Sequence, residues 1–169
     1  MCLSLFALVF FRKKSRAMRI KALEPEIVHM AGNTLVPAKA VTYKKAEDGK
    51  VTETIKPKTH EFENGLKEKM KHALKGVSLF PTKEHVFVSI THGLHSSNEY
   101  KNLDLDNRAK TILDALKGVV YDDDKQVRVL LTDKIFLENT PESYCRFSVK
   151  ILNKKTEKLL YKHLSRIGS

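Results

Sequence analysis

Three features of the sequence predict an α+β fold, in which a mixed β-sheet is packed with two main helices in one domain. Helical and β-type periodicities alternate along the chain without an internal repeat or a low-complexity linker. The 169 residues suffice for one domain, and 41% hydrophobic with 30% charged residues is typical of a soluble protein. Two cysteines, Cys2 and Cys145, form neither a disulfide framework nor a zinc set, which fits a cytoplasmic protein.

The first 17 residues differ from the rest of the chain. The apolar run Cys2–Phe11 is too short for a membrane span, and its basic residues, Arg12–Lys14, follow it instead of preceding it as in a signal peptide. Met18 opens a stretch that alternates like a first strand. We expect residues 1–17 to be an extension, either a start-site artefact or a short hydrophobic arm, and residues 18–169 to form the functional domain. No membrane partner is expected.

The part of the chain before residue 57 is predicted to be mainly β-structure. Arg19–Leu23 alternates as a strand, whereas residues 24–37 contain proline and glycine and are expected to be irregular. Lys39–Lys45 and Val51–Ile55 flank an Asp-Gly pair, which predicts a hairpin that ends at Pro57.

A helix is predicted over Thr59–Lys75, with Thr59 as its N-cap and Gly76 as a C-terminal cap. Its apolar residues recur at helical spacing. They are Phe62, Leu66, Met70, Ala73 and Leu74. Its lysine-rich opposite face is expected to be solvated.

The second half of the chain alternates strands and helices. Strands are predicted over Glu84–Thr91, Gln126–Thr132 and Tyr144–Leu152, and a short basic helix in the tail from Asn153 to Ser169. A helix is predicted over Asn107–Lys117, capped by Asp106 and ended by Gly118. Its apolar stripe comprises Ala109, Ile112, Leu113 and Leu116.

A polar loop is predicted from His92 to Lys101. Its two histidines, His92 and His95, could pair on a metal, but no second ligand pair has zinc-like spacing. We therefore expect solvent-exposed loop histidines.

The carboxylates concentrate in Asn102–Lys134, within a chain of net charge +11 and pI near 9.6. Asp104 and Asp106 form a pair, and Asp122–Asp124 follow the helix. The excess of basic over acidic residues indicates an acidic partner, with nucleic acid the first choice. An acidic cluster in a basic protein is what a metal-dependent enzyme acting on a polyanion needs.

Residues i and i+2 of an extended segment point the same way, so Asp104 and Asp106 can face one cation. Carboxylate oxygens are hard ligands that suit Mg²⁺, with Mn²⁺ as an alternative. Lys110 lies one helical turn after Asp106, where its amine can contact a phosphate. The helix between the clusters spans about 16 Å. Asp124 therefore reaches the same ion only if the chain folds back or if a second subunit supplies the ligand.

A calcium-binding EF-hand also begins D-x-D, but Ala109 and Ala115 stand where that loop needs Gly and Glu. The residues alone leave open a purely structural interpretation. In it, Asp104 and Asp106 are loop and cap residues and Asp122–Asp124 form a solvated turn.

The series D-L-D-N-x-x-K, D-A-L, G and D-D-x-Q-V, from Asp104 to Val127, resembles the RusA family of Holliday-junction resolvases. The resemblance implies a homodimeric, magnesium-dependent endonuclease of DNA recombination and repair. Such an enzyme cuts four-way junctions, a form of branched DNA, by paired symmetric incisions.

The resemblance also implies roles for individual residues. The metal-binding aspartates fall on Asp104, Asp106 and Asp124, and the catalytic lysine on Lys110. Supporting positions are Asn107, Asp114, Asp123 and Gln126, with Asp114 expected either as a partner of Lys110 or as a solvated residue, the former being favoured. DNA contacts are expected from Lys101, Arg108 and Lys110.

The chain departs from the family where arginines often precede the first aspartate, since it offers only Lys101 there. The alternative is therefore a non-catalytic or differently selective branched-DNA-binding protein of the same fold.

Overall fold

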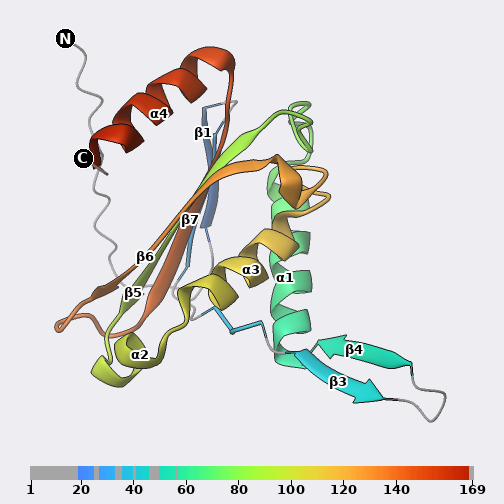
Figure 1. Cartoon of the computed structure of the whole chain (residues 1–169), viewed down its shortest axis with the longest axis vertical. Helices are drawn as coiled ribbons and strands as arrows, with labels where there is room; N and C mark the ends of the chain where they lie inside the picture. Colours follow the sequence, from blue (N-terminus) through green and yellow to red (C-terminus); the bar gives the residue numbers. More distant parts are fainter. Residues whose placement is uncertain are drawn as a thin grey trace.

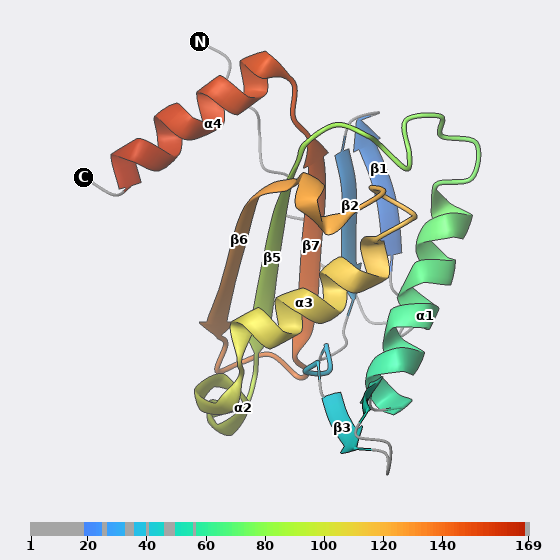
Figure 2. The ribbon, with the colours of Figure 1, turned by 45° about the vertical axis from the view of Figure 1, so that its right-hand side comes forward.

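The computed structural model describes residues 19–24, 27–32, 36–39, 41–45, 50–55 and 57–167. A five-stranded sheet has the order β1-β2-β7-β5-β6, and helices α1 and α3 cover one of its faces (Figures 1 and 2). Its strands are β1 (Arg19–Glu24), β2 (Ile27–Gly32), β5 (Val86–Leu94), β6 (Val127–Phe136) and β7 (Tyr144–Ile151). The described helices are α1 (Pro57–Ala73), α2 (Ser97–Asn102), α3 (Leu105–Leu116) and α4 (Lys154–Ile167), with the 3₁₀ turn η1 (Asp124–Gln126).

The sheet is mixed, which confirms the predicted α+β class. β5 pairs with β6 in parallel, and the other neighbouring strands pair antiparallel. Parallel neighbours need a crossover connection. Here the crossover consists of α2, α3 and η1, so it carries both the Asp104 and Asp106 pair and the Asp122–Asp124 cluster.

The core lies between the sheet and the two covering helices. The predicted stripes of α1 and α3 are largely buried and meet the inward side chains of β5 and β7, as their period of two requires. Buried members include Leu66, Met70, Leu74, Ala109, Ile112, Leu116, Val86, Val88, Ile90, Phe147 and Val149. This packing fixes α3 across the sheet.

The predicted hairpin is confirmed as β3 (Val41–Lys45) and β4 (Val51–Ile55), and its turn lies outside the described residues. It forms a separate two-stranded sheet that projects from the body beside the start of α1 (Figure 1). The preceding segment is anchored to both helices. The Thr59 hydroxyl donates to the Ala38 carbonyl at 3.1 Å, and the Thr111 hydroxyl donates to the Pro37 carbonyl at 3.0 Å.

Several predicted elements are wrong in part. The stretch expected to be irregular contains β2, which pairs on both sides in the sheet. Pro57 begins α1 instead of merely ending the hairpin, since proline suits the first turn of a helix. Thr59 therefore lies inside this helix and is not its N-cap.

The predicted polar loop is also wrong in part. β5 continues through His92 and Gly93 to Leu94, and α2, capped by Ser96, occupies much of the remainder. The tail forms α4 as expected. The expected extension, residues 1–17, lies outside the described residues, as does Cys2. None of the described helices is long and apolar enough to cross a membrane.

Candidate active site

Asp104 and Asp106 stand at the start of α3. Asp104 is the N-cap residue and Asp106 lies in the first turn, so the predicted cap was placed two residues too late. The Asp104 side chain makes no capping bond. Its carboxylate instead accepts a hydrogen bond of 2.6 Å from the Asn107 amide. Asn107 thus orients Asp104, a role consistent with its predicted supporting position.

The two carboxyl groups are adjacent and solvent-exposed. A hydrogen bond from the Asp106 carboxyl, followed by that from Asn107, lowers the pKa of Asp104. Backbone amides at a helix N-terminus also favour negative charge at this position. The pair offers hard oxygen donors at an open surface, and this donor set fits Mg²⁺ or Mn²⁺.

Lys110 is exposed on α3 one turn beyond Asp106. Within the described part of the chain, its amine has no hydrogen-bond or ion-pair partner. It is therefore available to an anion held near the carboxylates. Lys101 is likewise exposed, on the preceding helix α2.

Arg108 differs from these lysines because it is half-buried, and its Nε atom is shielded from solvent and has no hydrogen-bond partner among the described residues. Burial lowers the pKa of Arg108, and nearby Glu99 and Asp104 act in the opposite direction. The side chain predicted to contact DNA thus lies partly beneath the surface and contributes positive potential near Asp104.

His92 corrects the expectation of solvent-exposed loop histidines. It is fully buried in β5, and neither ring nitrogen has a hydrogen-bond partner among the described residues. Burial, reinforced by Arg108, lowers its pKa to about 4. His95 is exposed, and its Nδ1 lies 2.8 Å from the Ser143 hydroxyl.

The second acidic cluster lies beyond the other end of α3. Lys117 Nζ is 2.9 Å from Asp123 Oδ2 and 3.8 Å from Asp124 Oδ1. Hydrogen bonds from the Lys125 backbone amide and from Lys117 lower the pKa of Asp123. Sequence reasoning missed Lys117, although it immediately precedes the glycine that ends the helix.

Gln126 holds η1 against the segment that leads into β5. Its amide nitrogen donates to the Thr82 and Glu84 carbonyls at 2.8 and 3.0 Å, and its Oε1 accepts from the Asp123 amide at 2.8 Å. Asp123 and Gln126 together form a capping box. Both residues therefore fix the backbone that presents Asp124.

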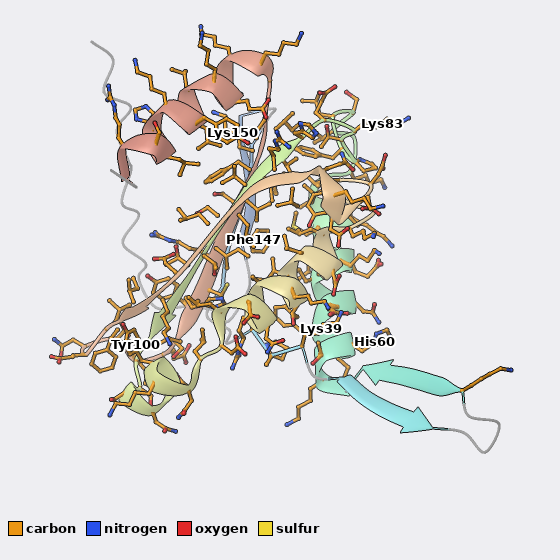
Figure 3. All side chains as sticks on the ribbon, in the orientation of Figure 1. Lys39, His60, Lys83, Tyr100, Phe147 and Lys150 are labelled. Carbon is orange, nitrogen blue, oxygen red and sulfur yellow. The ribbon has the colours of Figure 1, made fainter. Side chains whose placement is uncertain are left out.

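Asp114 has a different partner from the one expected. Its carboxylate bonds to the Lys39 amine, which also lies 3.0 Å from Glu63 Oε1. Figure 3 shows Lys39 beside α1 and α3, away from Tyr100. Burial by itself lowers the pKa of Lys39, but the bonds to Asp114 and Glu63 have the larger combined effect and raise it above its ordinary value. Asp114 thus anchors Lys39 and is not paired with Lys110.

The structure brings together only part of the predicted site. Asp104, Asp106, Asn107 and Lys110 cluster at the start of α3, whereas Asp124 lies past its end. The 12 residues of α3 span about 18 Å between the two clusters. In the part of the chain that the structure describes, no three metal-ligating side chains gather.

The chain is similar to a known protein family. The model of the family described as Endodeoxyribonuclease RusA matches residues 20–146. A search of the curated proteins finds no match. The matched range includes every predicted site residue and excludes α4.

Proposed function

This chain belongs to the RusA family of endodeoxyribonucleases, and from that premise we propose that it resolves four-way DNA junctions in recombination and repair. It would act as a homodimer that makes paired symmetric incisions. The observation that carries the proposal is the exposed Asp104–Asp106 pair with Lys110 one turn further along α3.

Three aspartates would hold the metal: Asp104 and Asp106 from the start of α3, and Asp124 from η1. A bound magnesium ion, or manganese in its place, supplies Lewis-acid activation of the phosphodiester and of the attacking water. Asn107 orients the Asp104 carboxylate through its 2.6 Å hydrogen bond. Asp123 and Gln126 set the position of Asp124 through the capping box.

Lys110 would donate to a non-bridging oxygen of the scissile phosphate. Its amine is exposed and makes no bond to another described residue, so little energy is needed to direct it toward a ligand. A fixed positive charge at this position stabilises the charge that develops in the transition state.

The affinity for DNA would come from positive charge around the site. The net charge of +11 favours a polyanion, and the exposed Lys101 and Lys110 flank the carboxylates. Arg108 adds potential from beneath the surface. Binding would weaken steeply as salt rises, because phosphate contacts release counterions. Two copies related by a two-fold axis match the symmetry of a four-way junction.

The test compares cleavage of a synthetic four-way junction with that of matched linear duplex, in Mg²⁺ or in EDTA. Wild type is measured beside Asp106→Asn and a matched control, Asp122→Asn, which removes an exposed carboxylate from the same acidic segment. We expect metal-dependent, symmetric cutting of the junction that Asp106→Asn loses and Asp122→Asn keeps.

Junction binding by the wild type without cutting would replace the proposal with the non-catalytic alternative. Equal cutting of junction and duplex would retain the nuclease and overturn its structure selectivity.

A further inference from the structure

The helix α4 lies outside the part of the chain that matches the family, which ends at residue 146. It extends from the end of β7 away from α1 (Figures 1 and 2). A reciprocal pair of hydrogen bonds marks its start. The Thr156 amide donates to Asn153 Oδ1, and the Asn153 amide donates to the Thr156 hydroxyl, both at 2.9 Å. Such side-chain bonds fix the beginning of a helix, so the direction in which α4 leaves the sheet is set locally.

The side chains of α4 divide between two opposite faces of the helix. The partly buried ones recur at helical spacing and share one face. They are Thr156, Glu157, Leu160 and Leu164. Glu157 Oε1 lies 3.3 Å from Arg128 Nε on β6, which shows that this face is turned toward the body of the protein. The opposite face, here called the basic face, consists of the exposed residues Lys154, Lys155, Lys158, Lys162 and Arg166.

Positive charges of the basic face repel one another along the helix. Four of them form a row in which each follows the last by four residues, a spacing at which like charges destabilise a helix. They are Lys154, Lys158, Lys162 and Arg166. Lys154 and Lys155 also stand in the first turn, where the helix dipole favours anions. Glu157 is the single acidic residue of α4 and is turned toward Arg128. A row of one sign that the helix itself does not offset fits an anionic partner.

The start of α4 is tied to the same segment as η1. The Leu152 amide, just before the helix, donates to the His85 carbonyl at 2.8 Å. The Gln126 side chain of η1 donates to the adjoining Glu84 carbonyl at 3.0 Å. α4 therefore begins near the turn that presents Asp124, not near the start of α3. Exposed basic residues also flank these contacts, and they are Lys83, His85 and Lys125.

Resting on the proposed function for the identity of the polyanion, we propose that the basic face of α4 binds the phosphate backbone of a duplex DNA arm that leads to Asp124. The row from Lys154 to Arg166 spans about 18 Å. This length corresponds to about five phosphate steps along one strand of a duplex. Contacts of lysine with phosphate carry no base information, so binding to α4 is independent of DNA sequence. Phosphate charge also offsets the repulsion along the row, so DNA stabilises the helix.

An anionic membrane surface is the other partner that a basic helix can have. A helix of that kind inserts a continuous apolar face beside its cations. In α4 the neighbouring apolar residues Leu160 and Leu164 are partly buried on the face turned toward the body. The exposed Leu159 and Tyr161 lie about 160° apart around the helix axis, so they form no common face. The arrangement therefore favours DNA over a membrane.

The proposal is tested by measuring the affinity of the full chain for a four-way junction over a range of salt concentrations, in EDTA so that no cutting is needed. The variant combines Lys158→Gln with Lys162→Gln, which removes two exposed charges of the row and keeps residues of similar helix propensity. We expect the slope of log affinity against log salt concentration to become shallower by about two, one for each lost phosphate contact. Affinity at about 0.1 M salt should fall about tenfold or more.

The matched control combines Lys69→Gln with Lys71→Gln, two exposed lysines of α1. It lowers the net charge by the same amount, so it separates a contact made by α4 from the general attraction of a basic protein. We expect the control to keep the salt slope of the wild type. An unchanged slope in a folded α4 variant, or an equal change in the control, would overturn the proposed contact. Circular dichroism verifies that both variants are folded.

Sedimentation with vesicles of phosphatidylcholine and phosphatidylserine tests the membrane alternative. Vesicle binding that the α4 variant loses, while its salt slope for DNA stays that of the wild type, would replace DNA with a membrane as the partner. The proposed function and the role of α4 can fail separately. Junction cutting by a wild type whose salt slope does not depend on α4 would keep the function and overturn the contact. An α4-dependent slope without any cutting would overturn the function and keep the contact.

Discussion

Removal of the Lys110 amine tests how far the proposed cleavage reaction depends on one side chain. Its amine is exposed on α3 and unengaged within the described residues, so its removal should leave the fold unchanged. We expect Lys110→Ala to cut junctions about 10²- to 10³-fold more slowly, as when a preorganised donor to a developing anion is lost. Junction binding should change little. Single-turnover cleavage and gel-shift binding at one salt concentration measure the two effects separately.

Lys71→Ala is the control for charge alone, because this exposed lysine of α1 is paired with Glu68 at 2.7 Å. A Lys110→Ala variant that cuts at the control's rate would remove Lys110 from the mechanism.

His92 should make the stability of the folded chain depend on pH. Its pKa is about 4 in the folded protein against an ordinary value of 6.5. Between these values the unfolded chain binds a proton that the folded chain does not, so the free energy of unfolding falls as the pH falls. The loss from this residue amounts to about 3 kcal/mol at most and is complete below the folded pKa. Urea denaturation between neutral pH and the folded pKa measures it.

His92→Leu isolates this contribution from that of the carboxylates. Leucine fills a similar volume and needs no hydrogen-bond partner, so stability near neutral pH should be equal or higher. The variant should lose less stability on acidification than the wild type. Parallel pH profiles for the two proteins would show that His92 is protonated equally in both states.

At the scale of elements, Gln126 connects η1 to the chain entering β5. Gln126→Ala leaves the Thr82 and Glu84 carbonyls without their side-chain donor. We expect a loss of about 1–2 kcal/mol in the free energy of unfolding. Cleavage should decrease more than junction binding does, because the backbone beneath Asp124 loosens.

Gln126→Glu is the informative companion variant. It retains an acceptor for the Asp123 amide but sets a carboxylate against two carbonyls, so it should be at least as damaging as alanine. A Gln126→Glu protein with normal stability and cleavage would contradict the positioning role.

The elements were predictable where local pattern and tertiary environment agree. The stripes of α1 and α3 and the alternation in β7 specify a buried face, and the structure buries it. β2 was missed because its short run between Pro25 and Gly32 becomes a strand only through its partners β1 and β7. β5 was ended too early at His92 and Gly93, whose polar or flexible character suggested a loop. Gly93 is needed there because a Cβ would approach the Tyr144 ring to 2.2 Å.

At the scale of the whole molecule, Lys39 connects three parts of the fold. It lies at the base of the β3–β4 hairpin and bonds to Glu63 on α1 and Asp114 on α3. Lys39→Met leaves two part-buried carboxylates facing each other, which should cost about 3–5 kcal/mol of unfolding free energy. Chemical denaturation measures the loss.

Lys71→Met breaks an exposed pair and serves as the control, with an expected cost within about 1 kcal/mol. Similar costs for the two variants would show that the Lys39 network is no stronger than a surface ion pair.

In the candidate site, too, contacts between residues close in sequence were predictable, and contacts between residues far apart in sequence were not. Two helical turns at the start of α3 contain Asp104, Asp106, Asn107 and Lys110, so the proximity of these residues follows from the helix itself. The partner of Asp114 comes from 75 residues away, and spacing along the chain carries no signal for it. The separation of Asp124 was foreseen as a geometric question, and the structure places Asp124 in η1, beyond the other end of α3 from Asp104.

The crossover between β5 and β6 also affects the order in which the strands pair during folding. The β1–β2 and β3–β4 pairs are antiparallel and close over short connections, so they can form early. β6 can join β5 only after the long connection through α2 and α3 is ordered. In refolding experiments, nuclease activity should therefore return with the phase in which β6 docks, after most of the secondary structure has already formed.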